Sequence, residues 1–236
     1  MAFGDVVSSD VVGYDTFGLR GNGQAAGAGI SFLNVDASAT TISDLTITGY
    51  SGSYAEAEVQ AKMLDGFGRG GTTYYWYDFT EEGQTYLGWF GESGEDYNDI
   101  EVAPGEGLWI YSPSTSFKLQ SSGVVPKTPI AVALRGNGQA KMVANPMPAT
   151  LKLGSISITG YSGAYAEAEV QAKKLDGFGR GGTTYYWYDF TEEGVTYYGW
   201  YGENGEDYND VDVAPGEGLW VYSPSTSFSV VFPSPL

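Results

Sequence analysis

Histidine and cysteine are absent from the 236 residues of this chain. Without imidazole or thiol groups, the chain cannot build a Ser-His-Asp triad, a cysteine nucleophile or the usual zinc and iron sites. What remains is carboxylate chemistry and oxygen ligands for ions such as calcium. No run approaches the roughly 18 apolar residues of a membrane helix. We therefore expect neither a membrane-inserted chain nor an enzyme of the common nucleophilic or zinc-dependent classes.

Basic residues are also scarce. Lys and Arg number 11 against 29 Asp and Glu, which gives a formal net charge of −18. Such a surface repels phosphate backbones and anionic lipid headgroups, so nucleic acid is excluded as an expected partner. The first residues, MAFGDVVSSDVVGY, lack the basic and apolar regions of a signal peptide, which indicates a soluble or already processed chain.

Aromatic residues and glycine are abundant, with 19 Tyr and 35 Gly. Short β-branched and aromatic runs, bounded by Gly, Pro, Asn or Asp, occur at 183–190, 195–201, 218–223 and 227–232. Turn signals such as Asn-Gly and Pro-Gly recur between such runs. The sequence therefore predicts an all-β fold of the sandwich or barrel type.

An internal duplication organises the chain. The segment from Thr48 to Phe117 returns from Thr159 to Phe228, with about 61 of about 70 positions identical. A repeat of this size is large enough to bury its own core. We predict two tandem, similar β-sandwich or barrel-like domains, residues 1–122 with an N-terminal extension strand and residues 123–236, joined near Gln120–Pro129. A single fold whose halves share strands is the alternative.

Two segments are ambiguous in sequence. Ala164–Leu175 combines helix-forming residues with strand-like alternation, and the glycine-rich turn after it favours a strand in a hairpin. The G-x-G-x-x-G patterns that begin at Gly66 and Gly177 precede an aromatic strand instead of the helix that a dinucleotide site needs. We interpret the two G-x-G-x-x-G patterns as glycine-rich hairpin loops and expect no nucleotide cofactor.

An acidic stretch in each copy is the candidate metal site. Clustered carboxylate and amide oxygens in a turn are the usual ligands of calcium, although the spacing differs from that of an EF-hand loop. Calcium is the one cofactor that these turns suggest. The candidate ligands are Glu95, Asp96, Asn98, Asp99, Glu206, Asp207, Asn209 and Asp210.

Aromatic strands supply the candidate contact surface. Alternation places Tyr185 and Trp187 on one face of their strand and Tyr188 and Phe190 on the other. In the run at 218–223 it likewise places Trp220 and Tyr222 on the face opposite to the two residues expected in the core. Since a two-layer protein buries one face of each sheet, some tryptophans should reach the surface. An alternating N-terminal segment could add to a sheet edge of another molecule. The candidate contact residues are Val6, Val7, Val11, Val12, Trp76, Trp109, Tyr111, Trp187, Trp220 and Tyr222.

Three motifs carry a resemblance to known proteins. VVGY at Val11–Tyr14, ANP at Ala144–Pro146 and APGEGLW at Ala103–Trp109 and Ala214–Trp220 resemble those of a group of poorly characterised exported bacterial β-repeat proteins. The resemblance implies an exported protein whose signal peptide has been removed, and it implies no activity.

These observations predict a non-enzymatic extracellular or cell-surface protein. The first hypothesis is a structural or adhesive protein that associates with copies of itself through β-edges and aromatic faces, as a fibre or surface assembly. The second is a carbohydrate-binding module that uses exposed Trp and Tyr. A glycosidase would need two opposed carboxylates in a cleft, and no pair among the acids is marked for that role.

Overall fold

The computed structural model describes residues 12–19, 24–30, 40–50, 59–63, 71–112, 116–136, 138–161, 170–175, 182–223 and 227–234. Within these ranges the chain forms antiparallel strands and two single-turn 3-10 helices, η1 (Ile42–Asp44) and η2 (Leu153–Ser155). The predicted all-β fold is confirmed.

The first half of the chain forms two sheets. One is five-stranded and the other is three-stranded, and all their ladders are antiparallel. The five-stranded sheet has the order β2 (Gln24–Gly29), β7 (Gly107–Ser112), β4 (Gln60–Lys62), β5 (Thr73–Glu81), β6 (Gln84–Phe90). The three-stranded sheet has the order β1 (Val12–Leu19), β8 (Phe117–Val124), β3 (Thr46–Thr48).

The second half repeats this pattern. Its five-stranded sheet has the order β10 (Gln139–Ala144), β17 (Gly218–Ser223), β13 (Gln171–Lys173), β14 (Thr184–Glu192), β15 (Val195–Tyr201). Its three-stranded sheet has the order β12 (Ser157–Thr159), β18 (Phe228–Phe232), β9 (Ile130–Leu134), and a short ladder joins β11 (Leu151–Lys152) to β16 (Asp212–Val213). Every ladder between these strands joins two strands of the same half. In the first half, the ladder between β1 and β8 extends to the pair of Val12 with Val124.

Each half has a hydrophobic core between its five-stranded and three-stranded sheets, an arrangement compatible with a β-sandwich. Alternation along the strands explains which side chains enter it: on β17, Leu219 and Val221 are buried, whereas Trp220 and Tyr222 on the other face are half-buried. This division of the strand was predicted correctly.

The first ambiguous segment contains a strand, and the glycine-rich patterns precede strands. Of Ala164–Leu175, residues 171–173 form β13 and residues 164–169 lie outside the described ranges. Gly71 and Gly182, the last glycines of the two G-x-G-x-x-G patterns, have φ of 86° and 88° and are followed by β5 and β14. The segment after each pattern is thus a strand, as expected for a hairpin loop.

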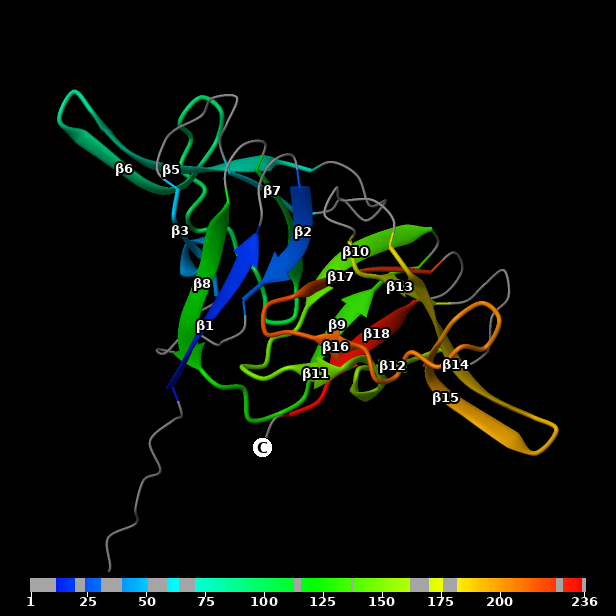
Figure 1. Ribbon diagram of the computed structural model, residues 1–236. Helices are drawn as coiled ribbons and strands as arrows, with labels where there is room; N and C mark the ends of the chain where they lie inside the picture. Colours follow the sequence, from blue (N-terminus) through cyan, green and yellow to red (C-terminus); the bar gives the residue numbers. More distant parts are fainter. Residues whose placement is uncertain are drawn as a thin grey trace, which may run out of the picture.

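The halves meet through equivalent elements. The amide of Gly29 donates to the carbonyl of Gly216 at 3.0 Å, and the amide of Ala144 donates to the carbonyl of Gly105 at 2.9 Å, a reciprocal pair of contacts. Figure 1 shows β2 and β10 side by side at this junction, while the β5–β6 and β14–β15 hairpins project from opposite ends of the molecule. Equivalent surfaces of the hairpins therefore lie far apart.

Candidate binding face of the five-stranded sheets

Two of the four tryptophans predicted to make contacts are in the interior. Trp76 is 3% exposed and Trp187 is fully buried. Each points toward the three-stranded sheet and packs edge-on against the tryptophan of the neighbouring strand, Trp89 at 5.5 Å and Trp200 at 5.4 Å between ring centroids. The prediction of a contact role is wrong for these two residues, because the second sheet covers the face that they occupy.

The other two tryptophans lie on the outer face, the face of the five-stranded sheet that points away from the core. Trp109 and Tyr111 on β7 are half-buried, and their rings are parallel within 10° at 5.4 Å. Trp220 and Tyr222 on β17 repeat these values. Lys62 and Lys173 lie 6.0 and 5.9 Å from the respective indole rings, near the limit of a cation-π contact.

A second group of aromatic side chains continues this outer face toward the projecting hairpin. The rings of Phe79 on β5 and Tyr86 on β6 are stacked at 4.9 Å and 10°, and Tyr77 lies 5.4 Å from Phe79. Tyr77 is 5% exposed, and its hydroxyl donates to the carbonyl of Gly91 at 2.8 Å. These residues are not among the contact residues expected from the sequence, although alternation along β5 indicates their common face.

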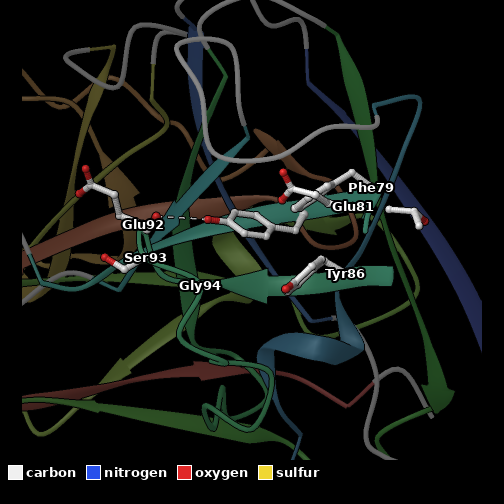
Figure 2. Close-up of a pocket in the computed structure, with 8 residues that line it drawn as sticks. Phe79, Glu81, Tyr86, Glu92, Ser93 and Gly94 are labelled. Atoms are coloured by element: carbon white, nitrogen blue, oxygen red, sulfur yellow. Dashed lines mark hydrogen bonds between the residues drawn. The ribbon is translucent and has the colours of Figure 1, made fainter. Parts of the chain in front are cut away.

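These three aromatic residues line an open pocket of about 520 Å³. Figure 2 shows Phe79 and Tyr86 on one side of it, with Glu92 and Ser93 on the other. Glu81 adds a second exposed carboxylate to the lining. The pocket thus combines apolar ring surface with hydrogen-bonding oxygens.

The second half repeats the ring arrangement. Phe190 and Tyr197 stack at 5.0 Å and 11°, and the hydroxyl of Tyr188 donates to the carbonyl of Gly202 at 3.0 Å. Two substitutions alter the surroundings, since Phe90 and Ser93 of the first copy correspond to Tyr201 and Asn204. Both changes add hydrogen-bonding groups.

The candidate calcium ligands are organised as a turn. Asp207 Oδ1 accepts hydrogen bonds from the backbone and side-chain amides of Asn209 at 2.8 Å, and Asn209 Oδ1 accepts from the amide of Trp200 at 2.9 Å. Asp96 and Asn98 form the same contacts in the first half. The pKa of Glu206 is held below its ordinary value, first by a hydrogen bond from its own backbone amide and then by one from the Asn204 side chain.

The remaining candidate ligands, Glu95, Asp99 and Asp210, lie in the same turns. Within the described residues, no group of three or more acidic side chains has a geometry suited to a metal ion. Calcium binding stays a prediction to which these contacts add no support.

Of the four N-terminal valines, Val6, Val7 and Val11 lie outside the described residues. The backbone of Val12 belongs to β1 and pairs with Val124 in the first half's own sheet. A strand donated to another molecule would therefore have to end before Val12.

Comparison of the chain with protein-family models, with curated proteins and with solved structures gives no match. Among the described residues, the structure has no helix with the length and hydropathy needed to cross a membrane.

Proposed function

We propose that this protein is a non-catalytic, extracellular glycan-binding protein with one contact surface on each half. The observation that carries the proposal is the aromatic cluster repeated at the hairpins, Tyr77, Phe79 and Tyr86 in one half, where it lines the pocket, and Tyr188, Phe190 and Tyr197 in the other. Sugar rings present apolar C–H faces that pack on aromatic rings, and their hydroxyl groups hydrogen-bond to carboxylate and amide oxygens.

The charge of the chain supports a particular class of glycan. At −18, the surface disfavours uronic-acid and sulfated polymers. Glu81 and Glu92 at the pocket would repel an anionic sugar, whereas they can accept hydrogen bonds from neutral hydroxyl groups. The ligand class is therefore a neutral polysaccharide. The extracellular location rests on composition and on the resemblance to exported β-repeat proteins.

Binding to a panel of neutral oligosaccharides, namely β-glucan, mannan, xylan and chitin fragments, tests this function by calorimetry on the full chain. The double variant Phe79→Ala/Phe190→Ala removes one ring from each aromatic cluster and should weaken binding at least tenfold, whereas either single variant should lower the stoichiometry by half. Tyr14→Ala is the matched control, because Tyr14 is 64% exposed on β1, in the three-stranded sheet.

Circular dichroism would establish that the variants are folded. If the parent chain binds none of the panel, or if the double variant binds as the parent does, the proposal is overturned.

A further inference from the structure

The outer edges of the projecting hairpins carry a feature that glycan binding does not use. Strands β6 and β15 are terminal strands of the five-stranded sheets. Their sequences, QTYLGWF and VTYYGWY, contain no charged residue, although the chain has 29 acidic residues. Natural proteins usually protect exposed edge strands with charges, so two uncharged edges indicate strands available for pairing.

Hydrogen-bond alternation identifies the groups that such an edge offers. The two-residue turns close on the pairs Glu81 with Gln84 and Glu192 with Val195. Since hydrogen-bonded and non-bonded pairs alternate in an antiparallel ladder, the backbone groups of Thr85, Leu87 and Trp89 point away from β5. The same alternation directs those of Thr196, Tyr198 and Trp200 away from β14.

One end of each edge is already occupied. The amide of Trp89 donates to Asn98 Oδ1 at 2.8 Å, and its carbonyl accepts from the amide of Tyr97 at 3.0 Å. Trp200 has the equivalent bonds. The outward window is thus limited to Thr85 and Leu87 on β6 and to Thr196 and Tyr198 on β15. On β6 the carbonyl of Thr85 also accepts a long hydrogen bond, 3.5 Å, from Gln84 Nε2.

Exposed apolar side chains accompany this window. Leu87 is 61% exposed, Val195 52% and Tyr198 56%, and with Tyr14 they are the large hydrophobic residues most exposed in the described structure. Pairing with another strand would cover them.

We propose that β6 and β15 are self-association edges, and that the occupant of each edge is β6 or β15 of a second copy of this chain, paired antiparallel. An antiparallel register centred on Tyr86 places Thr85 opposite the partner's Leu87 and forms about four backbone hydrogen bonds. The same register brings Gln84 opposite the partner's Gly88, so no two carboxylates face each other within the window. The register is self-complementary, which is the reason that the occupant is a second copy.

The position of the two edges determines the assembly. Because the hairpins project from opposite ends of the molecule, a copy bound at one end leaves the other end open (Figure 1). Pairing at both ends gives an open chain of molecules instead of a closed dimer. The partner's turn, with Glu82, would lie beside the acidic turn that begins at Glu92, so salt should promote association.

Edge variants of the full chain test this assembly by light scattering and electron microscopy at low and physiological salt. The parent should form linear oligomers whose size increases with salt. Leu87→Lys or Tyr198→Lys alone should stop assembly at dimers, and the double variant should be monomeric. The charge-matched control, Ser122→Lys/Ala133→Lys, alters exposed positions of the three-stranded sheets and should assemble as the parent does.

A second pair of variants separates the backbone from the side chains. Proline is tolerated where a strand's amide faces solvent, so Thr85→Pro/Thr196→Pro should remove one of the two outward amide donors of each edge and weaken assembly, while each hairpin keeps its own ladder. Circular dichroism reports folding. The proposal is overturned if the parent is monomeric in every condition, or if folded edge variants assemble as the parent does. Glycan binding is measured separately and can fail without affecting this result.

Discussion

Gly218 on β17 packs directly against Gly27 on β2, so that a Cβ atom added to Gly218 would lie 2.6 Å from the carbonyl carbon of Gly27. The contact is between backbone atoms, and no flexible side chain can move to make room. We expect Gly218→Ala to destabilise the protein by about 1–3 kcal/mol, because the two halves must separate locally to accommodate one methyl group.

Urea unfolding measures this effect, and Gly18→Ala is its control. A Cβ atom at Gly18 on β1 would meet no atom within 4 Å. That variant should be neutral or stabilising by up to about 1 kcal/mol. Equal stabilities for the two variants would contradict the close approach of the halves.

The next prediction concerns the two tryptophans of one core. Trp200 and Trp187 are both fully buried, and Nε1 of Trp200 donates to the carbonyl of Ile156 at 2.7 Å. Nε1 of Trp187 has no hydrogen-bond partner in the described part of the chain. We expect Trp200→Phe to cost about 1–3 kcal/mol more than Trp187→Phe, because only the former leaves a buried carbonyl unpaired.

Denaturant unfolding of the two variants gives the difference, and Trp89 with Trp76 offers an independent repeat in the first half. An equal or larger loss for Trp187→Phe would contradict this expectation.

Strand alternation made part of this structure predictable. The alternating face assignments were correct for Trp220 and for Trp187, because side chains in any strand alternate with period two. Alternation does not say which face the second sheet covers when both faces are aromatic, and the contact role of Trp76 and Trp187 was therefore predicted wrongly. Gly218 belongs to the APGEGLW motif, but nothing in that motif indicates Gly27 as its neighbour, so only the assembled fold shows their contact.

The hairpin turn of β14–β15 contains a strained residue. Glu193 has φ of 49° and is followed by Gly194 at 81°, both in the left-handed region. Asn tolerates this conformation better than Glu, so Glu193→Asn should raise the free energy of unfolding by about 0.5–1 kcal/mol. Thermal unfolding tests this expectation against Glu192→Asn, which lies in extended backbone and should give no gain.

Alkaline pH should weaken the fold through two tyrosines. Burial raises the pKa of Tyr74 and of Tyr185 above the ordinary value of 10.0. A neighbouring tyrosine raises each further, Tyr97 beside Tyr74 and Tyr208 beside Tyr185. Above that value the unfolded chain loses these protons before the folded chain does, so stability falls as pH rises. Urea unfolding between about pH 9 and about pH 11 should show a shallower fall for Tyr74→Phe/Tyr185→Phe than for the parent. An unchanged slope would contradict this assignment.

The acidic turn yields the last prediction. Asn209 Oδ1 accepts a hydrogen bond from the amide of Trp200, and Asn209 Nδ2 donates one to Asp207. The Asn209 side chain also lies so close to Gly199 that a Cβ atom there would clash with Oδ1 of Asn209. Asn209→Asp keeps the shape and the acceptor but replaces the donor to Asp207 with a second carboxylate. Stability at neutral pH should fall by about 1–3 kcal/mol, and it should recover toward acidic pH as one of the paired carboxyl groups takes up a proton.

Asn204→Ser is the control for this variant, since Asn204 is exposed in the same turn and the first copy has Ser93 at that position. Its stability should stay within about 0.5 kcal/mol of the parent. Thermal unfolding with millimolar calcium or with a chelator adds a direct test of the predicted metal site. A calcium-dependent rise in the parent would support that site by mass action. A rise confined to Asn209→Asp would mean that the natural turn lacks one carboxylate needed to hold the ion.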